Sequence, residues 1–390
     1  MFSFKKELDI LEDKGLRRFL RIVESDSASW LIVEGKRVLN LCSNNYLGLA
    51  NDPRIKQAAV KAINDYGFGS GASRLICGNM KLHRDLENRL AEFKKTESCL
   101  VYNSGYAANI GIISALVNRG DIIFCDKLNH ASIIDGAILS RAEFKRYPHK
   151  DAKALKALLE KSASFNKKLI ITDSVFSMDG DIAPLEELIE LAKEYSCLLM
   201  VDEAHATGVL GENGRGALEH LGLEDKKDFV IQMGTLSKAL GGFGAYVCGS
   251  KDLIDYLINY SRSFIYSTSL PPAIAAANIK AIDIIESEPQ LREKLRENIE
   301  FFKNKLKDLD FDIGESQSAI IPLMTREPKL TMDFSKRLFD EGVFVQGIRP
   351  PTVPLGKARL RITLMATHYI DDLEFALSKI KKVTKELCLT

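Results

Sequence analysis

The sequence predicts an α/β protein, with a large domain built on a mostly parallel sheet and a smaller α+β domain towards the C-terminus. From Asn44 onward, short and almost wholly apolar segments alternate with amphipathic ones, as strands and helices do in such a domain. Strands this apolar are expected in a parallel sheet that is covered on both faces. After Pro271-Pro272 charged helical patterns dominate instead. We therefore expect an N-terminal segment at 1–43, a large domain at 44–282 and a small domain at 283–390.

The individual elements follow from these patterns in chain order. A charged helix precedes short strands at 30–33 and 37–41. Strands of the large domain are expected at 98–102, 121–125, 168–173, 197–202, 229–233 and 245–248, with helices around 155–159 and 185–195. Further on we expect helices that end near 286 and span 291–309 and 332–341, strands at 318–323 and 358–363, and a final helix after Tyr369. Ligands of parallel sheets gather at the carboxyl ends of strands, where Asp126, Asp173 and Asp202 fall.

The bulk composition narrows the class of function. Of the 390 residues 46% are hydrophobic and 27% charged, and the formal net charge is +1. This balance gives no basis for a nucleic-acid or membrane-surface partner. No apolar run is long enough to span a bilayer, and no signal peptide is expected. The seven cysteines lack metal-ligand spacing, so we expect no metal site; they are Cys42, Cys77, Cys99, Cys125, Cys197, Cys248 and Cys388. Several of them lie inside apolar strands, which suggests buried free thiols in a reducing cytoplasm.

Lys238 is the residue that most strongly indicates the type of reaction. It follows the apolar segment 229–233 in a Gly-rich turn, and we expect it beside a helix start and largely out of water. Desolvation lowers the pKa of lysines used as nucleophiles from about 10.4 to roughly 7–8. Asp202 ends another apolar strand and His205 follows it. These three groups suit pyridoxal phosphate (PLP), whose aldehyde bonds to an amine and whose pyridine nitrogen pairs with a carboxylate.

Three further segments each have a structural and a functional interpretation. In Asn103-Ser-Gly-Tyr, Ser104 is either an ordinary helix cap or part of a phosphate seat formed with the free N–H groups of the helix start. His130, between a strand and a helix, is either structural or able to stack on an aromatic ring. Ser177 precedes Gly180 in a turn-rich segment. That segment is either a simple tight loop or places Ser177 near the cofactor's phenolic oxygen or the substrate carboxylate.

Arginines in the C-terminal part are candidates for binding an anion. Arg359 and Arg361 alternate along a predicted strand and therefore point to the same face. An arginine there is either a solvent-exposed charge or a two-pronged donor to a carboxylate. Arg349 opens the run Arg-Pro-Pro-Thr-Val-Pro. The Gly-rich stretch 67–74 lacks the Gly-Lys-Ser/Thr ending of a nucleotide loop, so we expect a flexible surface or subunit-contact segment.

Taken together, these segments resemble the α-oxoamine synthases, a family of fold-type I, aspartate aminotransferase-like PLP-dependent transferases. The matching strings start at Ser43 (Ser-Asn-Asn-Tyr-Leu-Gly-Leu), Gly69 (Gly-Ser-Gly), Val175 (Val-Phe-Ser-Met-Asp-Gly-Asp-Ile-Ala-Pro-Leu), Val201 (Val-Asp-Glu-Ala-His) and Ile348 (Ile-Arg-Pro-Pro-Thr-Val-Pro). The last is similar to the biotin-pathway branch of the family. The resemblance implies a homodimer with shared active sites that condenses L-alanine with pimeloyl-CoA or pimeloyl carrier protein, with loss of CO2. Glycine C-acetyltransferase (2-amino-3-ketobutyrate CoA ligase) or another α-oxoamine synthase is the alternative.

The resemblance also implies a role for each candidate residue. Lys238 would bond to the cofactor and later move protons at the substrate α-carbon, Asp202 would pair with the pyridine nitrogen, His205 would contact the phenolic oxygen and His130 would stack on the ring. The phosphate would be held by Ser104, Gly105, Tyr106 and Thr235, with Thr268 of a second subunit. The substrate would be bound by Arg361 and Asn44 at its α-carboxylate and by Arg349 at the acyl-chain carboxylate. Tyr106, where many relatives have Phe, and the run 74–77 depart from the family pattern.

Overall fold

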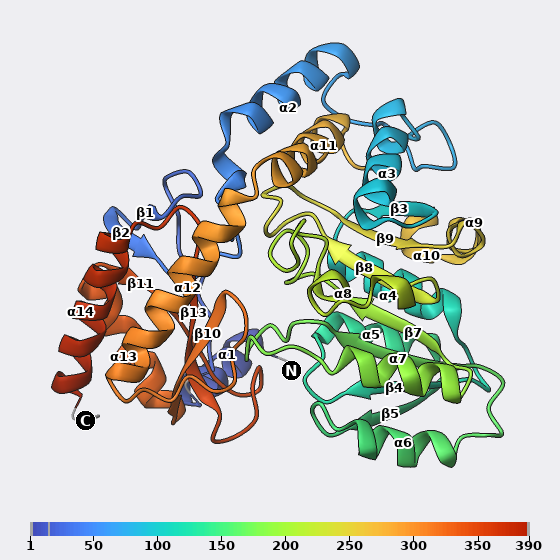
Figure 1. Ribbon diagram of the computed structural model, residues 1–390. Coiled ribbons are helices and arrows are strands. Elements are labelled where there is room, and N and C mark those ends of the chain that lie inside the picture. The colour runs from blue at the N-terminus through green and yellow to red at the C-terminus, as the bar shows by residue number, and fades with distance from the viewer. Residues whose placement is uncertain (1–2, 15, 388–390) are drawn as a thin grey trace.

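The computed structural model describes residues 3–14 and 16–387, which form the elements labelled in Figure 1. The helices are α1 (Phe4–Asp13), α2 (Pro53–Tyr66), α3 (Lys81–Lys94), α4 (Gly105–Leu116), α5 (Ala131–Ser140), α6 (Ala152–Glu160), α7 (Leu185–Glu194), α8 (Ala217–His220), α9 (Lys251–Tyr260), α10 (Arg262–Ile265), α11 (Pro272–Ser287), α12 (Gln290–Asp308), α13 (Pro328–Asp340) and α14 (Ile370–Glu386), with the short 3-10 helices η1 (Leu49–Asn51) and η2 (Glu224–Lys226). The strands are β1 (Trp30–Val33), β2 (Lys36–Asn40), β3 (Ser98–Tyr102), β4 (Ile122–Asp126), β5 (Glu143–Tyr147), β6 (Lys168–Asp173), β7 (Leu198–Asp202), β8 (Val230–Thr235), β9 (Ala245–Gly249), β10 (Ile320–Arg326), β11 (Val343–Phe344), β12 (Gln346–Ile348) and β13 (Ala358–Thr363). Cys388, one of the expected thiols, lies outside the described residues.

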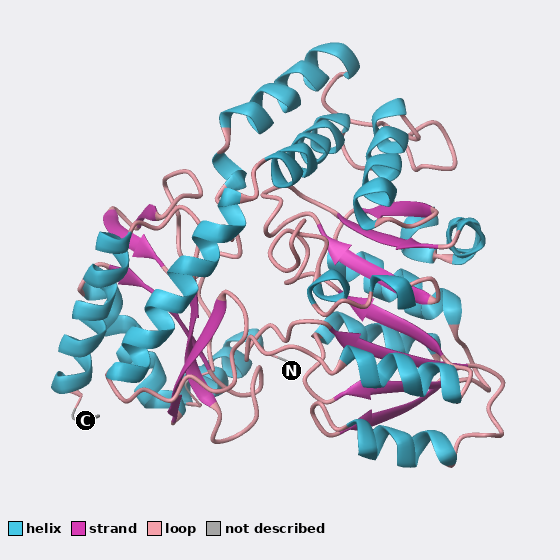
Figure 2. Ribbon diagram, in the orientation of Figure 1, coloured by secondary structure: helices cyan, strands magenta, loops and turns pink. Residues whose placement is uncertain are grey.

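The large sheet has the strand order β3-β9-β8-β7-β6-β4-β5 and confirms the mostly parallel arrangement. Strands β8, β7, β6, β4 and β5 run parallel, and β9 pairs antiparallel with both of its neighbours. Helices cover both faces (Figure 2). In β4, Ile122 and Phe124 pack with α6 and α7, whereas Ile123 and Cys125 pack with α4 and α5. Burial on both faces explains why this strand is apolar without alternation.

Two local expectations differ from the structure. Strand β5 was not predicted, because Glu143, Lys145 and Arg146 make its sequence polar. It lies at the edge of the sheet, where charged residues are tolerated and protect against pairing with other chains. The second difference concerns Lys238, since the chain after β8 continues as turns up to β9 and no helix starts there. The helix start that faces Lys238 is instead that of α4, which lines the same cavity.

The C-terminal part is a smaller α+β unit. Its antiparallel sheet has the order β10-β13-β12; α13 packs on this sheet, and α14 contacts both α12 and α13 (Figure 1). The N-terminal segment contributes to this unit, because β1 and β2 form a hairpin that pairs with β11 through Leu39 and Val343. Helix α1 has no buried residue. Within residues 3–14 and 16–387, none of the helices is both long and apolar enough to cross a membrane.

Candidate active site

The candidate site is a cavity of about 180 Å³ at the carboxyl ends of the parallel strands. Asp173 and Asp202, the last residues of β6 and β7, line this cavity, and so does Lys238, which follows β8. Residues that line the cavity are Gly105, Tyr106, Asn109, His130, Ser132, Asp173, Ser177, Asp202, Ala204, His205, Met233, Thr235, Ser237 and Lys238. Most of the candidate residues found from the sequence are therefore near one another, although they come from widely separated segments.

Lys238 is poised to act as an amine nucleophile. Burial lowers the pKa of its ammonium to about 8, against the opposing effect of the Asp202 and Asp173 charges, and Arg361 lowers it further. Its Nζ lies 2.9 Å from Nε2 of His205. At pH 8 the amine of Lys238 is consequently neutral in about half of the molecules, and the neutral amine is the form that attacks a carbonyl carbon.

A chain of hydrogen bonds leads from Lys238 to Arg361. Burial and the charges of Lys238 and Arg361 hold the pKa of His205 well below its usual range, so the imidazole is neutral. Its Nδ1 lies 2.7 Å from the hydroxyl of Tyr46, which donates to Oδ1 of Asn44 at 3.2 Å. With that donor direction, Nδ1–H of His205 donates to Tyr46 and Nε2 accepts from Lys238. Arg361 Nη2 donates to the same Asn44 oxygen at 3.1 Å.

Asp202 is a buried carboxylate held by two N–H donors. Its Oδ2 accepts from Nδ2 of Asn109 at 2.9 Å, and its Oδ1 accepts from the backbone of Ala204 at 2.9 Å. Asp173 is its register partner on the neighbouring strand. Burial and the charge of Asp202 raise the pKa of Asp173 well above its usual value. Asp173 therefore holds its proton more tightly than a free carboxyl group, and the Asp202 charge favours a cationic group in this part of the cavity.

The start of α4 supplies a seat for an anion. Ser104 caps the helix by accepting from the backbone of Ala107 at 3.1 Å, which confirms the expected cap. Gly105 and Tyr106 in the first turn line the cavity, together with Thr235 at the end of β8. The unpaired N–H groups and dipole of a helix start stabilise negative charge there. The cap and the anion seat are therefore compatible interpretations of the same segment.

His130 and Ser177 are both positioned by backbone contacts. His130 is the N-cap of α5, its backbone N–H donates to Asp173 at 2.8 Å, and its Nδ1 lies 2.8 Å from the Ser132 hydroxyl. Ser177 lines the cavity, and its carbonyl accepts from Nε of Arg361 at 2.5 Å. Arg361 is 8% exposed, so it is a buried cation beside the cavity and not a solvated one.

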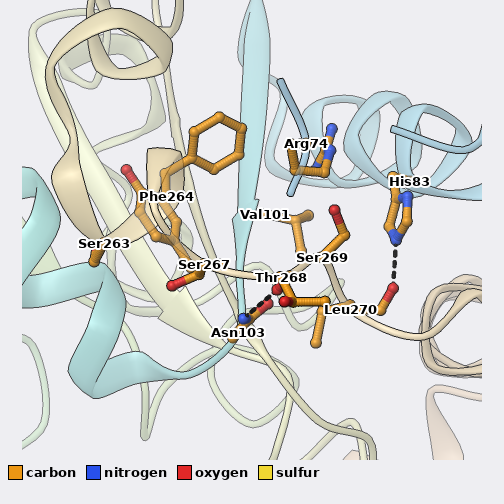
Figure 3. Close-up of a pocket in the computed structure, with 11 residues that line it drawn as sticks. Arg74, His83, Val101, Asn103, Ser263, Phe264, Ser267, Thr268, Ser269 and Leu270 are labelled. Atoms are coloured by element: carbon orange, nitrogen blue, oxygen red, sulfur yellow. Dashed lines mark hydrogen bonds between the residues drawn. The ribbon is translucent and has the colours of Figure 1, made fainter. Parts of the chain in front are cut away.

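Two candidates lie elsewhere. Arg349 lines a separate pocket of about 560 Å³ between the N-terminal segment and α13, where it donates to the carbonyl of Arg17. Thr268 is exposed and lies beside a small cavity that Arg74, His83 and Asn103 also line (Figure 3). Its carbonyl accepts from Nδ2 of Asn103 at 2.7 Å. Neither residue belongs to the set that lines the Lys238 cavity.

Tyr46, Asn109 and Ser132 are among the site residues that sequence reasoning missed. Asn109 lies one helical turn after Gly105, so helical spacing places it on the cavity side of α4. Ser132 lies two residues after His130 and contacts both His130 and Asn109. Tyr46 lies in the string starting at Ser43 that carries the family resemblance, but nothing in that string connects it with His205, which is 159 residues away.

Comparison with known proteins agrees with this geometry. The family model "Aminotransferase class I and II" matches residues 36–380. The 8-amino-7-oxononanoate synthase of Citrifermentans bemidjiense is 55% identical over 389 residues, covering 99% of both chains, and that of Geotalea daltonii is 54% identical over 393 residues, covering all of both.

The chain belongs to the class I and II aminotransferase family, in the group of the 8-amino-7-oxononanoate synthases. The expected class, a PLP-dependent acyltransferase of fold type I, is confirmed. A serine palmitoyltransferase from S. paucimobilis with a bound PLP–myriocin aldimine superimposes with a TM-score of 0.94 at 31% identity, over 99% of this chain and 98% of that one. An 8-amino-7-oxononanoate synthase from Francisella tularensis gives a TM-score of 0.77 at 32% identity, over 90% and 98% of the two chains.

The groups around the cavity fit PLP. Lys238 offers an amine that is partly neutral near pH 8, and Asp202 offers a buried carboxylate for the pyridine nitrogen. The start of α4 offers a phosphate seat. Oδ1 of Asn109 is buried and has no hydrogen-bond partner among the described residues. Because Asn109 lines the cavity, this oxygen is available to accept a hydrogen bond from a bound group.

Proposed function

We propose that this enzyme uses PLP to condense L-alanine with a pimeloyl thioester, of CoA or of a carrier protein, in biotin biosynthesis. The products are 8-amino-7-oxononanoate, CO2 and the free thiol. The observation that carries the proposal is the placement of Lys238, His205 and Asp202 in one cavity, with a buried arginine, Arg361, beside it. The names of the two relatives at 54–55% identity support the choice of reaction.

PLP, when bound, supplies an aldehyde that takes up the amino group and a ring that accepts the electron pair of the α-carbon. Arg361 and Asn44 bind the alanine carboxylate, which fixes the α-carbon over Lys238. Lys238 in its neutral form accepts the α-proton and returns a proton to the same carbon after CO2 has left. His205 accepts a hydrogen bond from Nζ and so orients the amine.

The remaining residues bind and orient the cofactor. Asp202 keeps the pyridine nitrogen protonated because a buried anion stabilises the adjacent cation. With PLP bound, His205 would contact the phenolic oxygen, near Ser177, and His130 would stack on the ring. Ser104, Gly105 and Tyr106 at the start of α4, together with Thr235, would hold the phosphate. Arg349, in its own pocket, binds the far carboxylate of the acyl chain.

We also propose a homodimer with shared active sites, in the cytoplasm. Thr268 would contact the cofactor phosphate of the second subunit. Support comes from two exposed large hydrophobic side chains: Tyr266, two residues before Thr268, is 72% exposed, and Ile76, three residues after Ser73, is 79% exposed. Ser73 forms a β-bridge with Thr268. The six described cysteines are free thiols, as expected in a reducing compartment. Sedimentation equilibrium tests the assembly, and a Thr268→Ala variant is expected to bind PLP more weakly.

Substrate competition tests the proposed reaction. Turnover is measured with L-alanine and pimeloyl-CoA, with glycine and acetyl-CoA, and with L-serine and palmitoyl-CoA, and the products are identified by mass spectrometry. We expect the first pair to give the highest kcat/KM. A preference for glycine with acetyl-CoA would show a glycine C-acetyltransferase, and a preference for the third pair would show a serine palmitoyltransferase.

A Lys238→Ala variant tests the central residue. Borohydride reduction of the wild type is expected to attach PLP covalently to Lys238, which peptide mass spectrometry detects. The variant is expected to lose both this attachment and turnover. Undiminished turnover in the variant would refute the assignment of Lys238.

A further inference from the structure

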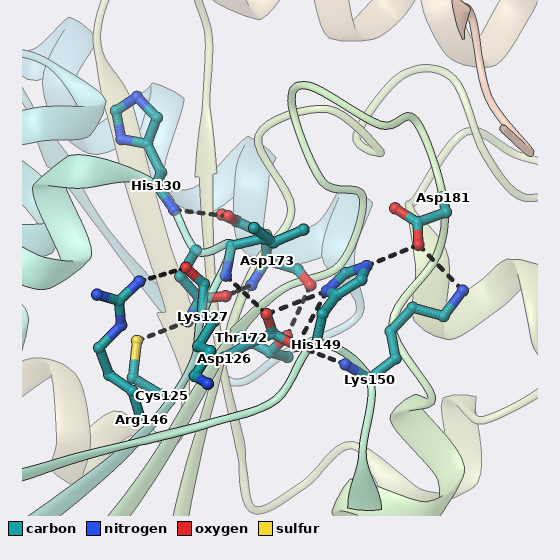
Figure 4. Close-up of polar contacts among 12 residues, drawn as sticks. Cys125, Asp126, Lys127, His130, Arg146, His149, Lys150, Thr172, Asp173 and Asp181 are labelled. Atoms are coloured by element: carbon teal, nitrogen blue, oxygen red, sulfur yellow. Dashed lines mark hydrogen bonds and ion pairs between the residues drawn. The ribbon is translucent and has the colours of Figure 1, made fainter. Parts of the chain in front are cut away.

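A cluster of ionisable side chains lies beside the candidate active site and outside the residues that line it (Figure 4). At its centre is His149, in the turn after β5. Its Nδ1 is 3.1 and 3.2 Å from the two carboxylate oxygens of Asp126, and its Nε2 is 2.9 Å from Asp181. Both ring nitrogens face an anion, so the doubly protonated imidazolium is the form that donates to both.

The electrostatics of the cluster favour that charged form. Burial opposes it, but the hydrogen bonds to Asp126 and Asp181 raise the pKa of His149 to about 9. Burial also acts to raise the pKa of Asp181, but the hydrogen bonds from His149 and Lys150 outweigh it and lower that pKa. Lys150 also ties its backbone N–H to Asp126 at 2.8 Å. The imidazolium is a bridge between the end of β4, where Asp126 lies, and the segment that contains Asp181.

That segment is a closed loop, 176–181. The backbone of Phe176 donates to the carbonyl of Asp181 at 3.0 Å, and Gly180 donates back to Phe176 at 2.8 Å. The ring of His149 meets the ring of Phe176 edge-on, with centroids 4.4 Å apart. His149 therefore holds the loop at two points, by charge at Asp181 and by packing at Phe176.

The loop presents its carbonyl groups to buried arginines of β13. The carbonyl of Ser177 accepts from Nε of Arg361, and that of Met178 accepts from Nη1 of Arg359 at 3.1 Å. Both arginines are at least nine-tenths buried, so their positions depend on these protein acceptors. A displacement of the loop moves the Ser177 carbonyl, and with it the guanidinium of Arg361.

We propose that His149 is a positioning residue that anchors loop 176–181 and thereby sets the position of Arg361 for the substrate carboxylate. The inference rests on the proposed role of Arg361 as the carboxylate-binding residue. It predicts a selective defect: weakened binding of the amino acid, with little effect on the cofactor or on the acyl thioester.

The test is steady-state kinetics of the PLP-loaded enzyme with a His149→Gln variant, which cannot donate to both carboxylates. We expect KM for alanine to rise about tenfold, with kcat and KM for the thioester changed by less than about twofold. A His368→Gln variant is the control, because His368 is likewise bonded through both ring nitrogens, but to the backbone of Asn40 and Met365 and not to carboxylates. That control is expected to keep the wild-type KM for alanine.

Two further variants make the outcome decisive. Asp181→Asn removes the other half of the bridge and is expected to repeat the selective rise in KM, even if His149→Gln folds poorly. If neither variant raises KM for alanine, the positioning role is refuted. An Arg361→Lys variant separates the role of His149 from the role of Arg361. If KM for alanine rises in Arg361→Lys but in neither of the other two variants, only the role of His149 is refuted. If KM for alanine is unchanged in Arg361→Lys, the role of Arg361 is refuted. In an Arg361→Lys background, His149→Gln is expected to add nothing, and a further tenfold rise would show that His149 acts by another route.

Discussion

Replacing Gly180 by alanine tests how tightly loop 176–181 is packed against the small domain. Gly180 has φ of +72°, and a Cβ built there would lie 2.1 Å from the carbonyl oxygen of Ile320 and 3.0 Å from its carbonyl carbon. Both atoms are backbone atoms of β10, so no side-chain rotation relieves the contact. The loop must therefore move away from β10, or the backbone of Gly180 must leave its left-handed conformation.

The cost can be divided with a matched control. Gly222 has φ of +68°, and a Cβ placed there would have no heavy atom within 4 Å. Gly222→Ala should therefore cost only the left-handed strain, about 1–2 kcal/mol. Gly180→Ala adds overpacking against backbone, about 1–3 kcal/mol. We expect Gly180→Ala to be more destabilising than Gly222→Ala by about 2 kcal/mol.

Urea unfolding followed by circular dichroism measures this difference, with protein and PLP concentrations held equal because ligand binding shifts apparent stability. The Gly180→Ala variant should also have a higher KM for alanine, since the Ser177 carbonyl that contacts Arg361 is in the displaced loop. Equal stabilities of the two variants would refute the packing argument. A large loss of stability in Gly180→Ala with unchanged KM would refute the link from the loop to the site.

Three other predictions address charge. Asp202→Asn removes a charge that raises the pKa of Lys238, so the pH dependence of PLP uptake by the apoenzyme should shift to lower pH; an unchanged profile would contradict this. Arg74→Ala removes the cation that pairs with the buried carboxylate of Glu87, and it should lower the free energy of unfolding in urea by about 3–5 kcal/mol. The double variant with Glu87→Gln should recover part of that loss. Equal losses in the single and the double variant would count against the buried ion pair as the cause. The pKa of His149 is raised in the folded state to about 9, so the stability it contributes is complete below about pH 6.5, its usual pKa, and is lost as pH rises through 9. Urea midpoints of wild type and His149→Gln should therefore differ more at about pH 6 than at about pH 9.5, and a gap that widens with pH would exclude the bridge.

The sequence predicted the strands that are buried on both faces, because such strands are apolar without interruption. The expected bounds of β3 and β6 match the structure, and those of β4, β7, β8 and β9 differ by one or two residues. Strand β5 escaped prediction because an edge strand is specified by its neighbour's hydrogen bonds and not by its own apolar content. The expectation that Lys238 lies beside a helix start has a different origin. A Gly-rich segment after a strand often precedes a helix, but here the chain continues as turns.

The sequence indicated which residues lie close together where parallel strands end at the same edge of the sheet. Asp173 and Asp202 are neighbours because their strands are in register, and that follows from strand order in an α/β sheet. Contacts between distant segments could not be found in this way. His149 is separated by 23 residues from Asp126 and by 32 from Asp181, and Tyr46 by 159 from His205. No periodicity connects such residues, so tertiary packing alone brings them together.

The hydrogen-bonded chain from Lys238 to Arg361 would give strand β13 of the C-terminal unit an electrostatic role in the proposed reaction. The positive charge of Arg361 lowers the pKa of Lys238 and of His205. When a substrate carboxylate binds to Arg361, as proposed, it offsets that charge, so the proton affinity of Lys238 increases on substrate binding. In the proposed mechanism the increase would come when Lys238 accepts the α-proton, because the same carboxylate would fix the α-carbon over it. Loop 176–181 holds Arg361 through Ser177, and the anchor at His149 therefore affects both where the substrate binds and how strongly the lysine takes up its proton.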